Sequence, residues 1–305
     1  MKIGIVGLGR MGRQLALRMR RSGFEAVGFD LDGTARDAAR QEGLLTVGSL
    51  PELVGCLEPP RRVWVMVPAG EPTDAVLREL LELLEPGDSA VDGGNSNYQD
   101  SMSHADRFRQ KGLGFLDVGT SGGVWGLENG YCLMVGGDET LCERWSDVFR
   151  VLAPSPDAGW VHVGPSGAGH YAKMVHNAIE YGMMQALAEG LELLQAKPLV
   201  RDVAAVTEAW RHGSVVRSWL LDLAADGLRE EPGLESLAPH VADSGEGRWA
   251  VEESVRLGVP TPVIATSLYA RFASRQENSF AARVLAMLRR QFGGHPVRRR
   301  EEGQR

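Results

Sequence analysis

Five side chains able to move protons or form hydrogen bonds recur at helical spacing in one short stretch of the sequence. Lys173, His176, Asn177, Glu180 and Tyr181 occupy positions i, i+3, i+4, i+7 and i+8. A helix of about 3.6 residues per turn brings such positions onto one face. An amine, an imidazole, an amide, a carboxylate and a phenol are suited to acid–base chemistry and to hydrogen bonding of a substrate. The stretch therefore predicts a helix that lines a cleft.

The apolar residues of the same stretch form a separate stripe, which we expect to face the core. The alternative is that the polar face is an ordinary solvated helix surface. Such surfaces usually carry repeated Glu and Lys in ion pairs, whereas this face mixes five different polar groups. The composition of the face favours function. The apolar stripe consists of Ala172, Val175, Ile179, Met183 and Ala186.

Length and charge limit the class of protein. The 305 residues, of which 43% are hydrophobic, suffice for about two domains of about 150 residues each. A net charge of −7 and a pI near 5.6 argue against a nucleic-acid partner. A local cationic pocket for a small anion, such as a phosphorylated metabolite, remains compatible with this charge.

Cysteine usage and hydropathy predict a cytoplasmic protein. Cys56, Cys132 and Cys142 are odd in number and scattered, which favours reduced thiols over a disulfide framework. No stretch reaches the about 20 apolar residues that a membrane span requires. Met1-Lys2 leads directly into a strand pattern, so we expect neither a signal peptide nor a membrane partner.

A glycine-rich turn near the N-terminus predicts a dinucleotide site. The apolar run Ile3–Val6 is followed by Gly7-Leu8-Gly9-Arg10-Met11-Gly12 and then by a helical pattern from Gln14 to Arg21. This G-x-G-x-x-G spacing permits a tight turn, a close approach of backbone to a pyrophosphate, and helix–strand packing. The helix N-terminus would then hold the phosphates.

An acidic residue after the second predicted strand supports a nicotinamide cofactor. The strand Glu25–Phe29 ends at Asp30, where a carboxylate can accept hydrogen bonds from the adenosine ribose. Asp30 and Asp32 would repel a 2′-phosphate, and no arginine directly follows them. We therefore expect NAD to be preferred over NADP.

Further strands and helices alternate as in a parallel doubly wound sheet. We expect strands at Val63–Val67, Ser89–Val91 and Gly114–Val118, with helices at 72–84 and 98–111. Ligands bind at the carboxyl ends of such strands. Each loop there could be a plain turn, but their joint position predicts the nicotinamide and substrate pocket, with Asn95 and Ser121 reaching the substrate. The loops are Val67-Pro68-Ala69-Gly70, Asp92-Gly93-Gly94-Asn95-Ser96 and Gly119-Thr120-Ser121-Gly122-Gly123.

Beyond Val163-Gly164-Pro165 the pattern becomes helical almost to the end, with a long helix near 167–196. The predicted fold class is α/β, with an N-terminal Rossmann doubly wound sheet followed by a smaller all-helical domain. We expect an NAD-binding domain over residues 1–165 and a helical substrate and dimerisation domain over residues 166–305.

This arrangement resembles the β-hydroxyacid dehydrogenase superfamily, and within it the decarboxylating 6-phosphogluconate dehydrogenases. The resemblance covers nearly the whole chain and is closest to the short, NAD-linked bacterial forms. Its most specific motif is Lys-Met-Val-His-Asn-x-Ile-Glu-Tyr at 173–181, since relatives acting on 3-hydroxyisobutyrate-like acids typically lack the Glu-Tyr pair. The other motifs are Asp92-Gly93-Gly94-Asn95-Ser96, Gly119-Thr120-Ser121-Gly122-Gly123 and Gly167-Ala168-Gly169-His170.

The resemblance implies oxidation of 6-phosphogluconate to ribulose 5-phosphate and carbon dioxide. It assigns Lys173 as the base and later the acid, Glu180 as the proton donor to the enediol, and Asn95, His176 and Asn177 to the surroundings of the reacting hydroxyl. The chemistry agrees, because a neutral Lys173 can take the hydroxyl proton and the resulting ammonium can polarise the ketone during decarboxylation. Desolvation in a closed cleft would favour the neutral amine.

For the substrate phosphate the resemblance implies Arg248 and Arg271, with Tyr181, Ser121, Gly122 and Gly123 also lining the site. Arginine suits this role through its bidentate fork. Two positions depart from the family pattern. Arg248 occupies the place of a usual lysine, and Ala250 that of a threonine which contacts the phosphate, so the affinity for phosphate is open.

The stretch Arg289–His295 resembles the tail that enters the partner's active site in the family. We therefore expect a homodimer or larger even oligomer in which Arg289 and His295 reach the neighbour's substrate phosphate. The run Arg298-Arg299-Arg300 is followed by two glutamates and is interpreted as a solvated tail.

No metal is expected. The nearest cluster, His104-Ala105-Asp106, is interpreted as an ordinary helix surface. Two other functions compete: a dehydrogenase of a small 3-hydroxy acid that does not decarboxylate, and a non-catalytic nucleotide sensor. The phosphate-binding arginines and Glu180 argue against the first, and the intact pair of Lys173 and Glu180 argues against the second.

Overall fold

The computed structural model describes residues 2–298, so most of the predicted basic tail, from Arg299 onward, lies outside the described residues. The chain forms two compact units, Met1–Ala178 (unit 1) and Ile179–Arg305 (unit 2). This division falls inside a long helix, whereas the predicted domains, 1–165 and 166–305, divide the chain before that helix. The predicted domain boundary stays a prediction.

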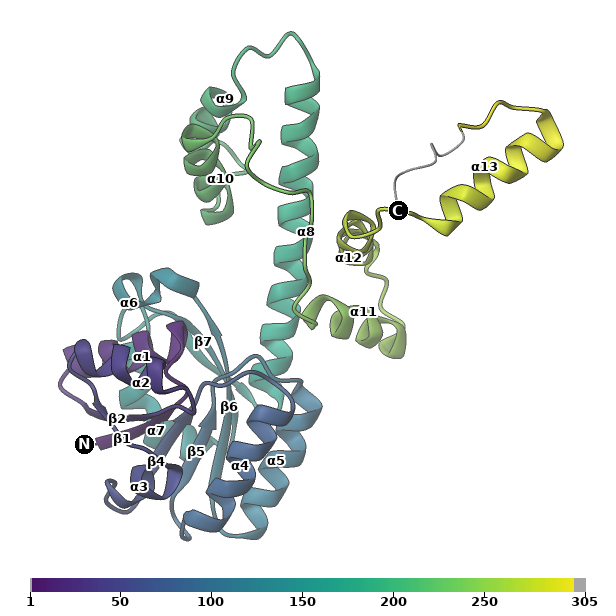
Figure 1. Ribbon diagram of the computed structural model, residues 1–305. Coiled ribbons are helices and arrows are strands. Elements are labelled where there is room, and N and C mark those ends of the chain that lie inside the picture. Colours follow the sequence, from purple (N-terminus) through teal and green to yellow (C-terminus); the bar gives the residue numbers. More distant parts are fainter. Residues whose placement is uncertain (1, 299–305) are drawn as a thin grey trace. The chain divides into compact units, whose positions relative to one another are not determined.

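Unit 1 is built around one eight-stranded sheet (Figure 1). The strand order is β3-β2-β1-β4-β5-β6-β7-β8, which is the doubly wound arrangement that the alternation of strands and helices predicted. The strands are β1 (Lys2–Val6), β2 (Glu25–Phe29), β3 (Leu45–Thr46), β4 (Arg62–Val65), β5 (Ser89–Asp92), β6 (Gly114–Ser121), β7 (Cys132–Gly137) and β8 (Trp160–Gly164).

A parallel sheet was expected, but the observed sheet is not entirely parallel. β7 pairs antiparallel with β6, and β8 runs parallel to β7. Neither strand was predicted, and the direction of each depends on pairing across the sheet rather than on the local pattern of the sequence. The reversal means that β8 ends at the edge where β1 to β6 begin.

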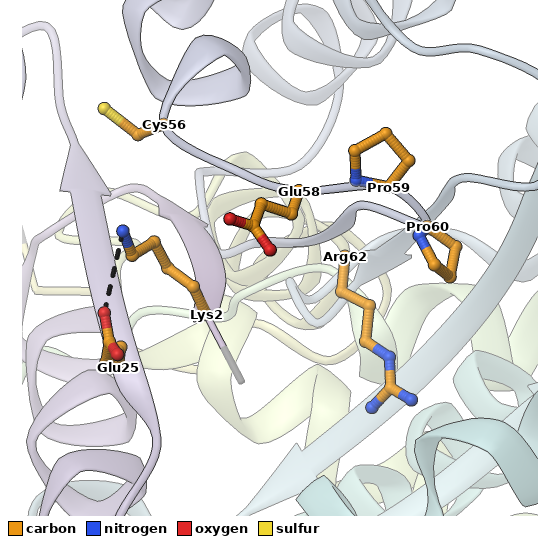
Figure 2. A pocket seen from close by; sticks show the side chains of 7 residues that line it. All are labelled: Lys2, Glu25, Cys56, Glu58, Pro59, Pro60 and Arg62. Carbon is orange, nitrogen blue, oxygen red and sulfur yellow. Dashed lines mark ion pairs between the residues drawn. The ribbon is translucent and has the colours of Figure 1, made fainter.

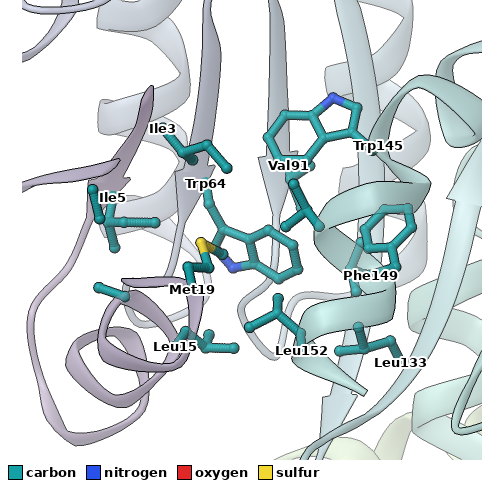
Figure 3. Packing of buried hydrophobic residues seen from close by; sticks show 14 of the residues in the cluster. Ile3, Ile5, Leu15, Met19, Trp64, Val91, Leu133, Trp145, Phe149 and Leu152 are labelled. Carbon is teal, nitrogen blue, oxygen red and sulfur yellow. The ribbon is translucent and has the colours of Figure 1, made fainter. Parts of the chain in front are cut away.

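Helices cover both faces of the sheet because side chains alternate along each strand. On one face, α1 and α7 pack on Ile3, Ile5 and Trp64, and Trp64 contacts Trp145 and Phe149 of α7 (Figure 3). On the other face, α3, α4 and α5 pack on the alternate strand residues. The helices and the single 3-10 turn of the described part of unit 1 are α1 (Arg10–Arg21), α2 (Gly33–Gln41), α3 (Leu50–Gly55), α4 (Glu71–Leu83), α5 (Tyr98–Gln110), η1 (Gly123–Trp125), α6 (Gly126–Asn129) and α7 (Glu139–Leu152).

The long helix α8 (Ala168–Ala196) continues from unit 1 into unit 2, and unit 2 is otherwise helical. Its extent confirms the predicted helix at 167–196, and the Rossmann-plus-helical fold class is likewise confirmed. No helix in the described part of the chain is both long and apolar enough to cross a membrane. The remaining helices are α9 (Val203–Trp210), α10 (Trp219–Glu230), α11 (Glu246–Leu257), α12 (Pro262–Ser274) and α13 (Phe280–Gly293).

A cavity of about 350 Å³ lies where β1, β2 and β4 begin (Figure 2). An ion pair between Lys2 and Glu25, 3.6 Å apart, crosses part of it. Its charged side chains nearly balance one another, and it lies at the opposite end of these strands from the predicted cofactor loops. The lining residues are Lys2, Glu25, Cys56, Glu58, Pro59, Pro60 and Arg62.

Candidate active site

The glycine turn after β1 has the geometry that a dinucleotide requires. Gly7 has φ +93°, and a Cβ there would lie 2.3 Å from the Met66 carbonyl oxygen. A Cβ on Gly12 would lie 2.0 Å from the Gly7 carbonyl oxygen, so this glycine permits close packing of helix and strand. A Cβ on Gly9 would meet no protein atom within 4 Å, which leaves open space for a ligand against the backbone.

The first turn of α1 is open to an anion. Its N-cap, Gly9, supplies no side-chain hydrogen bond, and the turn contains no acidic residue. The orphan N–H groups and positive end of the helix dipole therefore suit a pyrophosphate. Arg10 is exposed beside this turn, while Met11 packs against the core of the sheet.

Asp30 lies beside the glycine turn. One carboxylate oxygen accepts the Leu8 N–H at 2.7 Å, and the other accepts the Asp32 N–H at 2.8 Å. A carboxylate has about four lone-pair sites, so acceptor capacity is left for ribose hydroxyls. The Leu8 side chain is itself in the core. Arg36, which sequence reasoning missed, donates to the Asp30 and Leu31 carbonyls at 2.6 and 3.1 Å and brings a cation to this corner.

The loops after β4 and β5 lie against each other. A Cβ on Gly94 would be 3.0 Å from the Val67 carbonyl oxygen. Thr73 donates to the Pro68 carbonyl at 2.9 Å and fixes this loop, in which Pro68 and Ala69 are exposed. The structure thus brings the predicted cofactor residues Val67, Pro68 and Ala69 next to the loop of the half-buried Asn95.

Lys173 lies on α8 where the helix packs directly on β6. A Cβ on Gly119 would be 2.4 Å from the Lys173 Cβ, so only glycine permits this contact. The Lys173 side chain is 8% exposed. Further along, His176 Nε2 lies 3.4 Å from Ser121 Oγ and Nδ1 lies 3.1 Å from Asn177 Oδ1. Lys173, His176, Asn177 and Ser121 are therefore brought together within unit 1.

The predicted core stripe of α8 is wrong. Val175, Ile179 and Met183 are exposed, Ile179 by 52%, whereas Met174 and Ala178 are buried. Lys173 and Tyr181, assigned to the polar face, are buried as well. The periodicity identified the helix but not which of its sides is covered. The glycines of β6 leave room for the helix to pack closely with its small and polar residues, so these residues lie on the covered side.

In unit 2, α8 carries Glu180 and Tyr181. Tyr181 is 4% exposed, and its hydroxyl accepts the Ser244 N–H at 3.1 Å. The Arg271 guanidinium stacks on the Tyr181 ring, 3.5 Å from its centroid, and donates to the Ala242 carbonyl at 2.9 Å. Glu180, half-buried, follows Lys173 by two turns on the same helix.

Arg248 lies beside Asp243, a residue that sequence reasoning missed. Arg248 donates to both Asp243 oxygens at 2.7 and 3.0 Å, and Arg275 approaches one of them at 2.8 Å. Hydrogen bonds from these two guanidinium groups lower the pKa of Asp243 to about 2. Ala250 faces the buried side of α11.

Arg289 and His295 are exposed. Arg289 is on α13, none of whose residues is buried, and His295 follows its end, with its ring 6.2 Å from that of Phe292. The stretch is therefore free of core contacts in a single chain.

The interpretation of His104 as helix surface is wrong. His104 is buried and lies 3.0 Å from Asp74, and burial lowers its pKa. Among residues 2–298, no three His, Cys, Asp or Glu side chains form a metal-binding group.

Comparison with known proteins identifies the family. Residues 2–164 match the NAD binding domain of 6-phosphogluconate dehydrogenase, and residues 169–302 match the C-terminal domain of the same enzyme. The chain belongs to the 6-phosphogluconate dehydrogenase family. It is therefore an oxidoreductase with an NAD-binding domain.

Relatives in the 6-phosphogluconate dehydrogenase family match over most of the chain. The NAD(+)-dependent, decarboxylating 6-phosphogluconate dehydrogenase of Haloferax volcanii is 43% identical over 99% of this chain and 100% of its own length. The enzyme of that name from Bacillus subtilis is 36% identical over 93% of this chain, which spans 64% of the longer relative. The structure of Plasmodium falciparum 6-phosphogluconate dehydrogenase, studied with NADP+ and with 6-phosphogluconate, aligns with a TM-score of 0.82 at 25% identity, covering 100% of this chain and 67% of that one.

Proposed function

We propose that the protein oxidises 6-phosphogluconate and decarboxylates it to ribulose 5-phosphate and carbon dioxide, with NAD as the preferred oxidant and without a metal. The observation that carries the proposal is the match of 43% identity to an NAD(+)-dependent, decarboxylating 6-phosphogluconate dehydrogenase over that relative's whole length. The open turn at Gly9 and the burial of Lys173 support it.

Lys173 handles the proton of the reacting hydroxyl. NAD, when bound, would supply the acceptor for the hydride that leaves the hydroxyl-bearing carbon. As a neutral amine, Lys173 takes the hydroxyl proton in the same step and becomes an ammonium. Its 8% exposure keeps competing water away. Asn95, His176 and Asn177 orient the hydroxyl by hydrogen bonds.

The same ammonium then assists decarboxylation. It transfers its proton to the new ketone oxygen, which receives the electron pair as the bond to the carboxylate breaks and carbon dioxide leaves, so that an enediol and a neutral Lys173 remain. The enediol needs a proton on the carbon that becomes carbon 1 of the product, and Glu180 supplies it as a general acid while Lys173 takes back the proton of the enediol hydroxyl. This step completes ribulose 5-phosphate.

Cationic and hydroxyl groups bind the substrate phosphate. We propose Arg248 and Arg271 as the charged ligands, with Tyr181, Ser121 and the backbone of Gly122 and Gly123 completing the set. The ion pair with Asp243 holds the Arg248 guanidinium in one orientation. It also offsets part of the positive charge that Arg248 presents to the phosphate.

The first experiment measures reduction of NAD and, separately, NADP by 6-phosphogluconate without added metal, with carbon dioxide followed in the same reaction. Turnover with NAD and one carbon dioxide per NADH supports the proposal. Reduction without carbon dioxide contradicts decarboxylation. No reduction contradicts the substrate and directs the assay to small 3-hydroxy acids.

Asp30→Asn should shift cofactor preference toward NADP. Loss of the carboxylate removes repulsion of the 2′-phosphate, and Arg36 is then available to attract it. We expect the ratio of kcat/KM for NADP to that for NAD to rise about tenfold, equivalent to about 1.4 kcal/mol. Asp37→Asn, at an exposed position on α2, the helix that carries Arg36, is the control. An unchanged ratio, or native preference for NADP, contradicts the argument.

We also propose a homodimer or larger even oligomer with exchanged tails. A single chain leaves Phe280, Leu285 and Phe292 of α13 exposed, and it also leaves Val175, Ile179 and Met183 of α8 exposed. A second copy would cover apolar side chains of this kind. In this arrangement Arg289 and His295 reach the neighbour's substrate phosphate.

Mixing two inactive variants tests the exchange. Lys173→Ala and Arg289→Ala chains, unfolded together and refolded, should regain activity, because one site of each mixed dimer receives an intact Lys173 and an intact tail. Tails acting within their own chain would leave every mixed site defective. Sedimentation at assay concentration should give a dimer or larger, and a fully active monomer contradicts the proposal.

A further inference from the structure

Two fully buried aspartates occupy neighbouring strands beneath the candidate active site. Asp92 ends β5 and Asp117 lies in β6, and both are 0% exposed. They are register partners in a parallel pair, so their side chains point to the same face of the sheet. That face is the one on which α5 packs, since Ala90 and Phe115, two residues earlier in each strand, belong to its core.

Asp117 holds the start of α8. One carboxylate oxygen accepts the Gly167 N–H at 2.7 Å and the other accepts the His170 N–H at 2.9 Å. These N–H groups belong to the end of the helix that lacks intrahelical partners. Lys173 follows His170 by three residues, so the amine is carried by the turn of helix next to the one that Asp117 fixes.

Glycines make this attachment close. A Cβ on Gly169 would be 2.4 Å from the carbonyl oxygens of both Asp117 and Met134, and one on Gly136 would be 2.6 Å from Asp117 Oδ1. The helix backbone therefore lies directly on β6 and β7, and a shift of the Asp117 carboxylate would be transmitted to Lys173 without a flexible side chain between them.

Asp92 fixes the loop that carries Asn95 in the way that Asp117 fixes the start of α8. One oxygen accepts the Gly94 N–H at 3.0 Å, and the other accepts the Ser96 hydroxyl at 2.7 Å. Asn95 lies between these two attachment points. Its backbone is consequently fixed with respect to β5.

We propose that Asp92 and Asp117 are a pair of positioning residues that set the separation of Asn95 from Lys173. The inference rests on the proposed function for the roles of those two side chains. Neighbouring strands are about 4.8 Å apart, so the register pairing gives the two carboxylates a constant spacing. Asp117 thereby fixes the position of Lys173 and Asp92 that of Asn95, and each of these two side chains lies on one side of the reacting hydroxyl.

A carboxylate is required at both positions. Asparagine offers only one acceptor oxygen, and its NH2 group would face a second donor. Asp117→Asn therefore loses one of the two bonds to α8 while preserving side-chain volume. We expect kcat to fall by about 10- to 100-fold, the range for a misplacement of about 1 Å, with KM for NAD within about twofold of the original. Asp138→Asn is a matched control, because Asp138 caps α7 through the Leu141 N–H at 2.9 Å and α7 carries no site residue.

An NMR measurement that needs no turnover distinguishes a displaced Lys173 from a general loosening of the fold. The sequence contains only four lysines, Lys2, Lys111, Lys173 and Lys197, so protein labelled with [6-13C]lysine gives four assignable NMR signals. In Asp117→Asn, the Lys173 shift and its pH titration should change while the other three stay. In Asp138→Asn, all four should stay, and kcat should be unchanged.

A double-mutant cycle tests the pair. If both aspartates act on one distance, Asp92→Asn with Asp117→Asn should lower kcat by less than the product of the single effects.

A kcat for Asp117→Asn within twofold of the original, or common movement of all four lysine signals, overturns the proposal. Should Asp117→Asn fail to fold, Ser96→Ala tests the other half, since it removes one bond to Asp92, and unchanged kcat there also overturns it. If the original protein does not oxidise 6-phosphogluconate, the proposed function fails, while the Lys173 signal still tests the placement.

Discussion

Replacing Lys173 by alanine should abolish turnover. In the proposed mechanism the amine serves in two successive steps, and general acid–base catalysis contributes about 10²- to 10⁴-fold to each such step. NAD binding should persist, because the Gly7–Gly12 turn and Asp30 do not involve this side chain. The measurements are kcat with 6-phosphogluconate and the Kd of NAD by fluorescence titration.

Lys197→Ala is the matched control for that substitution, since Lys197 is exposed just beyond the end of α8. Its kcat should stay near that of the original protein. Methylamine should restore part of the activity of Lys173→Ala by occupying the space of the missing amine. Near-normal turnover of Lys173→Ala without added amine would remove Lys173 from the mechanism.

Glu180→Gln should impair the last step and spare the first. The enediol would then be protonated by water, so formation of ribulose 5-phosphate should slow by about 10²-fold or more while the first hydride transfer stays fast. Rapid mixing should reveal a burst of NADH followed by a slow steady state. In D2O, the original protein should deliver deuterium to one face of carbon 1.

The stereochemistry of this deuterium distinguishes a proton donor from a merely nearby carboxylate. Product from Glu180→Gln should carry deuterium on both faces of carbon 1, as judged by NMR. Glu189→Gln, an exposed position further along α8, should retain both the rate and the single face. A normal rate with retained stereochemistry in Glu180→Gln would falsify the assignment.

The local elements were predictable because their signals are local. The glycine turn, Asp30 and the helices found at α4, α5 and α8 agree with their predicted ranges within about two residues. Spacing along α8 also identified Lys173, His176 and Asn177 as neighbours. The antiparallel course of β7 was not predictable in this way, because a strand's direction depends on its partner.

The buried groups were missed for a related reason. Asp117 follows Phe115-Leu116 and precedes Val118, and a lone carboxylate in an apolar strand is itself a signal, because burying it requires hydrogen-bond partners. Its partners lie 50 and 53 residues away, at Gly167 and His170. No periodicity within the sequence points to them. Asp243 was missed because its role depends on where α11 and α12 bring Arg248 and Arg275.

The reversal of β7 and β8 has a consequence for how this site can change over evolution. Because β8 ends at the amino edge of the parallel strands, α8 ascends beside β6, and Gly119 and Ser121 meet Lys173 and His176 in the same order. Two strand residues span about 6.6 Å and three helix residues about 4.5 Å, so the alignment of strand and helix positions shifts by about 2 Å with each such step. Insertion or deletion of one residue in α8 before Lys173 would rotate the amine by about 100° about the helix axis and turn it away from β6. New substrate preferences should therefore arise by exchange of side chains at fixed positions, with the length of this segment held constant.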